Sequence, residues 1–386
     1  MKKYLIYILP FLFVVQSVAQ KNNIANYSSA NALIYQFLKS ENVGGSLDFQ
    51  QIKNTKPDYF FADHAMYWGE MKEGKPDGVG IKYVKDSSFY IGEFSNGFRN
   101  GTGIKISNIS LYIGGFMNDH LNGFGAIYIF KDSIGFQQNL SLLLNGGYKK
   151  MQEPEMLKGN ISGVFSNMDK GDSLEKIEGS ETKYIRDEKT QTITTTAVRK
   201  GKFIGGTLVG YGIFELEYAN PESPLFGKII YMGSVASEPS GNIVAYFIDK
   251  KKNTRTKYEG VFDNMFDFNG KRIESNGMIS EGNFKNLELN GWGKQYDDLT
   301  SIEGNFVKNV LSGKGVLKYK EGSKYQAGTY FDGSWENGLP INGTFFNAAT
   351  EEYIKGSLVN GELDGTVTIN QKGKTTTAVY RQGQRQ

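Results

Sequence analysis

Three glutamates recur at a fixed interval in the last third of the chain. Glu259, Glu281 and Glu303 each precede a glycine, and successive members are 22 residues apart. If each interval is one β-hairpin, their carboxylates form a ladder on one sheet face, two strands or ~10 Å apart. Glycoside hydrolases use pairs of carboxylates ~5–10 Å apart. A regular ladder is also typical of a solvated face. That interpretation is favoured over a binding ladder or a hydrolase site, because nothing marks one acid for a raised pKa.

Two tryptophans are candidates for ligand contact. Trp68 alternates with Tyr67 along a predicted strand, so it points to the opposite face and is expected to be exposed. Trp292 stands between Gly291 and Gly293 and faces away from them. An exposed indole suits stacking on a sugar or anchoring a protein partner. Packing against a neighbouring loop is the alternative for both residues.

Other catalytic or metal-binding patterns are weak. The chain has no cysteine, which excludes disulfides, thiolate catalysis and zinc ribbons. Its two histidines, His64 and His120, are not accompanied by a Gly-x-Ser-x-Gly elbow, so a Ser-His-Asp triad is not favoured. Asp267-Phe-Asn-Gly270 resembles part of a calcium loop, but Met265 and Asn276 occupy ligand positions of that loop. The sequence therefore predicts no enzyme, no cofactor and no metal.

A repeat of about 22 residues organises most of the chain. Six anchor glycines are each followed by further glycines nine and eleven residues later, and by Phe or Met two residues later. Agreement at three offsets in six copies indicates a repeat architecture. The repeat positions are represented by Tyr67, Gly69, Tyr90, Gly92, Phe94, Gly101, Gly103, Tyr112, Gly114, Phe116, Gly282, Phe284, Gly291, Gly293, Gly304 and Phe306.

Each copy is predicted to be one hairpin. Tyr90, Gly92 and Phe94 share a face because alternate residues of a strand do, and Asn96-Gly97 allows the positive φ of a tight turn. Glycine weakens a strand interior unless another group must approach the backbone closely. We therefore expect aromatic rings over bare glycine backbone, with the hairpins adding side by side. The predicted fold is all-β, an elongated single-layer antiparallel sheet of stacked hairpins with a short N-terminal helix.

The segment Tyr90-x-Gly-Glu-Phe-x-Asn-Gly-x-x-x-Gly-x-Gly103 resembles the MORN repeat (membrane occupation and recognition nexus), in an exported bacterial type. Tyr67-Trp-Gly-Glu-Met71 and Tyr258-Glu-Gly-Val-Phe262 resemble it as well. The resemblance implies scaffolding, dimerisation or membrane-proximal assembly. In later copies Ser280 and Ile302 replace the motif tyrosine, where a bulge or a shifted ring is expected.

The expected organisation has five parts. They are a signal peptide (1–19), a linker with a cap helix (20–60), a first MORN-like array (61–125), a degenerate β region (126–197) and a second array (198–386). The cap helix, over about 28–40, is interpreted as a cover for the first sheet edge, with docking on a partner or lipid as the alternative. Residues 126–197 are interpreted as further strands with longer loops, or as a break between two arrays.

The first twenty residues resemble an export signal. Lys2 and Lys3 precede an apolar run of 12 residues, and Ser17-Val-Ala19 predicts cleavage after Ala19. The run is shorter than the ~20 residues of a membrane span, so no transmembrane span is expected after signal removal. Without Lys2 and Lys3 the net charge falls from +3 to +1, which gives no field to attract nucleic acid.

These features predict a non-enzymatic scaffold in the periplasm, at the cell envelope or outside the cell, which binds a protein partner or self-associates. A module that binds envelope polysaccharide or lipid is the alternative, and a glycan hydrolase is a further one. The binding residues expected from the sequence are Trp68, Trp292, Glu259, Glu281 and Glu303.

Overall fold

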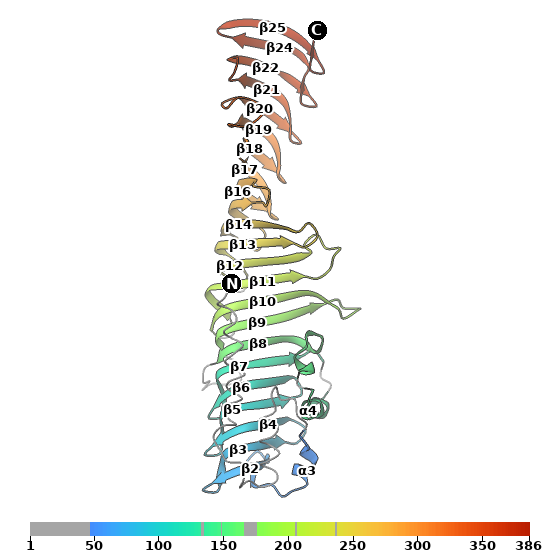
Figure 1. The fold of residues 1–386 in the computed structure, drawn as a ribbon, viewed down its shortest axis with the longest axis vertical. Helices are drawn as coiled ribbons and strands as arrows, with labels where there is room; N and C mark the ends of the chain where they lie inside the picture. The colour runs from blue at the N-terminus through green and yellow to red at the C-terminus, as the bar shows by residue number, and fades with distance from the viewer. Residues whose placement is uncertain (1–46, 133–134, 148, 166–175, 205–206, 236–237) are drawn as a thin grey trace. The chain divides into compact units, whose positions relative to one another are not determined.

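The computed structural model describes residues 47–132, 135–147, 149–165, 176–204, 207–235 and 238–386 (Figure 1). The chain forms two compact units that divide between Asn220 and Pro221, here called the N-terminal and C-terminal units. The predicted signal peptide and cap helix lie outside the described residues. None of the helices in the described ranges is long and apolar enough to cross a membrane.

The N-terminal unit is an open antiparallel sheet in which strands pair in chain order. Its strands are β1 (Tyr59–Phe60), β2 (Met66–Lys72), β3 (Lys75–Val84), β4 (Ser88–Ser95), β5 (Phe98–Ser107), β6 (Ser110–Met117), β7 (His120–Phe130), β8 (Leu157–Phe165), β9 (Lys176–Arg186), β10 (Ile193–Ile204) and β11 (Thr207–Tyr218). Two helices, α3 (Phe49–Lys53) and α4 (Phe136–Leu144), lie beside strands β2 to β5 (Figure 1). The 3₁₀ turns η2 (Lys150–Gln152) and η3 (Pro154–Met156) lead into β8.

The C-terminal unit continues the same hairpin pattern. Its strands are β12 (Gly227–Ser234), β13 (Gly241–Asp249), β14 (Thr254–Phe262), β15 (Phe268–Ile273), β16 (Ile279–Lys285), β17 (Glu288–Tyr296), β18 (Thr300–Val307), β19 (Val310–Tyr319), β20 (Tyr330–Glu336), β21 (Leu339–Asn347), β22 (Glu352–Val359), β23 (Glu362–Leu363), β24 (Gly365–Gln371), β25 (Lys374–Arg381) and β26 (Gln384–Arg385). The all-β antiparallel hairpin fold predicted from the sequence is confirmed.

A row of paired glycines recurs in the strands of both units. In the N-terminal unit successive strands β2 to β11 pair glycine with glycine, from Gly69 opposite Gly80 to Gly201 opposite Gly212. In the C-terminal unit the row runs from Gly260 through β15 to β21 and ends at Gly356. The repeat glycines therefore set the register between neighbouring strands.

In the N-terminal unit, tyrosine rings lie over this glycine row, as predicted. A Cβ added to Gly103 would lie 2.4 Å from the Tyr90 ring, so the ring lies against the bare backbone. The Tyr90 hydroxyl donates to the carbonyl oxygen of Glu93 at 2.9 Å, which holds the ring in place. Tyr67 and Tyr112 make the equivalent hydrogen bonds at 2.8 and 2.9 Å. Glycine is needed in these strands because the ring occupies the position of a side chain.

A β-bulge recurs in the hairpins. The register shifts between Gly69 and Met71, between Gly92 and Phe94, and at the same place in later copies. The extra residues lie on the second strand of each hairpin, and in the first two copies a glutamate of the first strand caps them: Glu93 Oε2 accepts from the Thr102 backbone at 2.7 Å. The bulge is thus a regular part of the repeat, and not confined to the copies that lack the motif tyrosine.

The C-terminal unit fills the tyrosine space differently. Leu289 approaches Gly282 and Gly293, and Leu311 approaches Gly304 and Gly315, each within about 3 Å of where a Cβ would lie. These leucines belong to the strand that follows the missing tyrosine. The sequence predicted a bulge or a shifted aromatic ring in these copies. The space of the missing ring is filled instead by a leucine side chain from the partner strand.

Candidate binding surfaces

Trp68 is not exposed, so its expected exposure was wrong and the packing alternative describes it. Its side chain is 1 % exposed in a core that α3 covers. The Phe49 ring packs edge-on against the indole with centroids 5.9 Å apart, and Trp68 Nε1 donates to the carbonyl oxygen of Thr55 at 3.3 Å. Strand alternation correctly placed Trp68 on the face opposite Tyr67. Helix α3 packs on that face, so Trp68 belongs to a second hydrophobic core. Trp68 therefore stabilises the fold and offers no surface to a ligand.

Trp292 is exposed, as predicted, with 61 % of its side chain accessible. It lies on β17, opposite Asn305 of β18. Trp335 is buried and donates from Nε1 to the carbonyl oxygen of Gly315 at 2.9 Å. Of the three tryptophans in the chain, Trp292 alone can contact a ligand without a change in the fold.

The glutamate ladder exists, but lysines stand between its members. The cross-strand register joins one charged residue from each of the strands β14 to β18. In order along the sheet they are Glu259, Lys271, Glu281, Lys294 and Glu303. This row is here called the charge ladder. The three glutamates thus occupy a row of alternating sign, and they do not form the acidic ladder expected from their spacing.

Two of the three glutamates in this row are paired with a lysine. Lys271 Nζ lies 2.9 Å from Glu281 Oε1, the same oxygen that accepts from the Tyr296 hydroxyl at 2.7 Å. Glu259 is paired with Lys257 on its own strand. The hydrogen bond from Lys271, supported by Tyr296, lowers the pKa of Glu281, and the same contact raises the pKa of Lys271. A general acid of a hydrolase needs a raised carboxyl pKa, so Glu281 is shifted in the opposite direction.

Two asparagines flank Trp292, and sequence reasoning missed both. Asn283 and Asn305 directly follow Gly282 and Gly304, and each faces the bulged part of the next strand, β17 or β19. Both are exposed, and Asn283 Oδ1 accepts from the side-chain amide of Asn269 at 2.6 Å. Their position could have been predicted from the repeat, because each directly follows the anchor glycine of its copy, as Glu93 does in an earlier copy. Trp292, Lys294 and Tyr296, with the neighbouring Asn283 and Asn305, are here called the tryptophan patch.

A second surface lies at the turn ends of the C-terminal hairpins. Aliphatic side chains 40 to 54 % exposed collect at the turns of β18–β19, β20–β21 and β22. They are Val307, Val310, Leu339, Ile341 and Val359, here called the aliphatic edge. Successive turns are joined by backbone hydrogen bonds, such as that from Gly338 to the Leu311 carbonyl at 3.0 Å. Sequence reasoning did not single out these residues.

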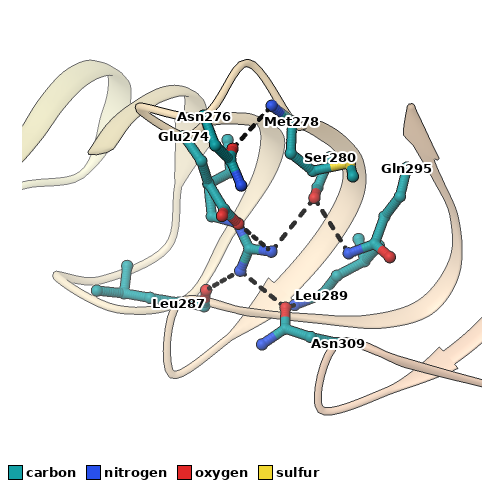
Figure 2. A network of polar contacts seen from close by, with 9 residues as sticks. Glu274, Asn276, Met278, Ser280, Leu287, Leu289, Gln295 and Asn309 are labelled. Carbon is teal, nitrogen blue, oxygen red and sulfur yellow. Dashed lines mark hydrogen bonds and ion pairs between the residues drawn. The ribbon is translucent and has the colours of Figure 1, made fainter. Parts of the chain in front are cut away.

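A buried arginine network holds the first hairpins of the C-terminal unit together (Figure 2). Arg272 is 8 % exposed and lies opposite Ser280, the residue that replaces the motif tyrosine. Its guanidinium donates to Asn309 Oδ1 at 2.8 Å and to the Leu287 carbonyl at 3.2 Å, and it lies 3.0 Å from the Glu274 carboxylate. The network ties two turns to the sheet. Apart from Arg272 Nε, which is buried without a hydrogen-bond partner, its polar groups bond one another, which indicates a structural role.

No metal centre is found in the described part of the chain, where no three His, Cys, Asp or Glu side chains are grouped closely enough to hold an ion. His64 and His120 are both exposed and lie in different parts of the N-terminal unit, before β2 and at the start of β7.

Comparison with protein families identifies three repeats. The MORN repeat model matches residues 67–86, 90–108 and 303–324. The first two segments cover β2–β3 and β4–β5, and the third covers β18–β19. A comparison with curated protein sequences gave no match.

Proposed function

We propose that this protein is an exported, non-enzymatic repeat scaffold that binds a protein partner through the aliphatic edge of its C-terminal unit. MORN repeats often mediate protein or membrane interactions, and the three matching segments support a role of this kind. The observation that carries the protein contact is the aliphatic edge. Five exposed aliphatic side chains at successive turns form a hydrophobic strip, and such strips on rigid elements are typical of protein interfaces.

The rigidity of this edge supports the proposal. The Asn309 backbone donates to the Leu289 carbonyl at 2.9 Å, and its side-chain oxygen accepts from the Leu289 backbone at 2.7 Å. Gly338 lies against Val310, where an added Cβ would be 3.4 Å from a Val310 methyl group. Because the turns are held by one another, little conformational freedom is lost when a partner binds.

Export is the second part of the proposal. It rests on the basic and apolar residues at the start of the chain and on the small residues before Gln20. Cell fractionation and N-terminal sequencing of the mature protein test it. We expect recovery outside the cytoplasm with Gln20 as the first residue. Recovery of full-length protein in the cytoplasm would contradict it.

In-cell crosslinking of the tagged protein, followed by affinity capture and mass spectrometry, tests the contact. A stoichiometric partner, or a crosslinked homodimer, is expected with the natural sequence. The double variant Val310→Lys, Leu339→Lys should lose it, because charges on the strip must be desolvated in the interface. Val261→Lys is the matched control, since Val261 is an exposed valine on a sheet face of the same unit. Equal capture by both variants would exclude the aliphatic edge as the contact.

A further inference from the structure

We propose that the tryptophan patch of the C-terminal unit binds an uncharged glycan chain. This activity is separate from the protein contact proposed above, because the patch lies on the sheet face and the aliphatic edge lies at the turns. The inference starts from the environment of Trp292, and three observations carry it: its exposure, its flanking groups and the charge balance around it.

The patch has a regular layout. Trp292, Lys294 and Tyr296 alternate along β17 and so share one face. On β18 the register places Asn305 beside Trp292 and Glu303 beside Lys294. On β16 it places Glu281 beside Lys294, and Asn283 faces the bulged part of β17 that contains Trp292. An exposed indole is thus set on a rigid strand, with amides on both neighbouring strands and carboxylates one step further along.

This combination fits the chemistry of a sugar ring. A pyranose presents C–H groups on its face and hydroxyls around its rim. An indole offers a flat apolar surface for that face, and amides and carboxylates offer donors and acceptors to the hydroxyls. Asn305 lies directly across from Trp292 on β18 and Asn283 lies on β16 at the other side, so a sugar stacked on the indole would lie between two strands that carry amides. Apolar contact with a few placed polar groups is the usual composition of a ligand site.

The charge balance selects an uncharged ligand. The charge ladder and the adjoining Lys257 hold three lysines and three glutamates, so these six charges cancel. Lys257 pairs with Glu259 and Lys271 pairs with Glu281. Such a surface creates no long-range field for an acidic polymer or an anionic membrane. A neutral polysaccharide can bind to this surface without electrostatic repulsion.

Fluorescence titration tests the proposal directly. Trp68 and Trp335 are buried, so a change on ligand addition reports Trp292. The probes are the uncharged hexasaccharides laminarihexaose, cellohexaose and chitohexaose, added to the purified mature chain. We expect a saturable change in emission with at least one probe, little affected by salt. The Trp292→Ala variant should bind that probe about ten-fold or more weakly than the natural protein does, as measured by calorimetry.

A matched control distinguishes binding at the tryptophan patch from non-specific binding to any exposed aromatic residue. Tyr211 is an exposed aromatic at the same place between paired glycines, but it lies in the N-terminal unit. Tyr211→Ala should bind the probes as the natural protein does, and circular dichroism should show Trp292→Ala folded. The proposal is overturned if no probe binds, if Trp292→Ala binds equally well, or if only polyanions bind with steep salt dependence. It is also overturned if Trp292→Ala instead removes a captured protein partner.

Discussion

Lys271 Nζ lies 2.9 Å from Glu281 Oε1, across the neighbouring strands β15 and β16. The contact explains why a row of regularly spaced glutamates is not an acidic surface. Lys271 stands between Glu259 and Glu281, and Lys294 stands between Glu281 and Glu303. The repeat therefore produces a row of alternating charge, in which Glu281 is paired with Lys271 across the two strands.

The first prediction concerns the energy of this pair. Glu281→Gln should reduce the free energy of unfolding by less than about 1 kcal/mol, because both side chains are more than one-third exposed. Since the pKa of Glu281 is lowered below its usual value of 4.5, its contribution is present above about pH 4.5 and lost as the pH falls through the folded-state value. Urea denaturation of both proteins across this range measures the difference. A difference that grows on acidification would contradict the assignment.

Much of the fold could be predicted from the sequence because the repeat acts locally. Asn96-Gly97 forms its own turn, and Gly103 leaves room for the Tyr90 ring of the same hairpin. The lysines of the charge ladder were also readable, since Lys271 and Lys294 directly follow the second glycine of their hairpins. The prediction considered the glutamates alone and so mistook an alternating row for an acidic one.

What the sequence did not reveal depends on distant contacts or on weak local signals. Alternation along β2 fixes the face of Trp68 but not that Phe49, 19 residues earlier, covers it. Helix α4 was missed because Gly135 at its N-cap supplies no side-chain hydrogen bond and its first turn has no acidic residue. The aliphatic edge arises because several turns stack, which no single copy of the repeat displays.

The second prediction tests the glycine row. Gly103→Ala should reduce the free energy of unfolding by about 3 kcal/mol, because the new methyl group would meet the Tyr90 ring at 2.4 Å. Gly97→Ala is the control: its φ is +89° but nothing lies within 4 Å of an added Cβ, so only backbone strain of about 1 kcal/mol is expected. Chemical denaturation compares the two. Equal losses would mean that the Tyr90 ring moves aside and does not require glycine at position 103.

The third prediction contrasts two tryptophans. Trp68→Ala removes a buried indole from the core under α3 and should cost about 3–5 kcal/mol. Trp292→Ala removes an exposed indole and should change stability by no more than about 0.5 kcal/mol. Thermal or urea unfolding of each variant measures this. A large loss in Trp292→Ala would show that this residue packs in the fold and would remove it as a ligand contact.

The fourth prediction concerns alkaline stability. Burial raises the pKa of Tyr258 from 10.0 to about 12. The folded state therefore keeps the phenol proton up to a higher pH than the unfolded state does. The resulting stability is fully present below pH 10 and is lost as the pH rises toward 12, by about 1.4 kcal/mol for each pKa unit between the two states. Tyr258→Phe should therefore lose less stability than the natural protein between these pH values. Parallel alkaline slopes for the two proteins would show that Tyr258 titrates as a solvated phenol.

The fifth prediction concerns Arg272, whose guanidinium joins a strand to two turns (Figure 2). Arg272→Ala should reduce the free energy of unfolding by about 3–5 kcal/mol, because it leaves the Leu287 carbonyl and the Asn309 side chain without this donor. Arg272→Lys should recover only part of the loss, since an ammonium cannot reproduce the planar fork that reaches Asn309 and Glu274 together.

Arg255 provides the comparison for this variant pair. It is an exposed arginine on β14 of the same unit, where its guanidinium lies 3.9 Å from the centre of the Tyr246 ring. Arg255→Ala should cost no more than about 1 kcal/mol, as expected for an exposed cation–π contact. Hydrogen exchange at the Leu287 and Asn309 amides locates the effect: faster exchange is expected in Arg272→Ala and unchanged exchange in Arg255→Ala. If Arg272→Ala unfolds at the same urea concentration as Arg255→Ala, the network contributes no more than a surface contact.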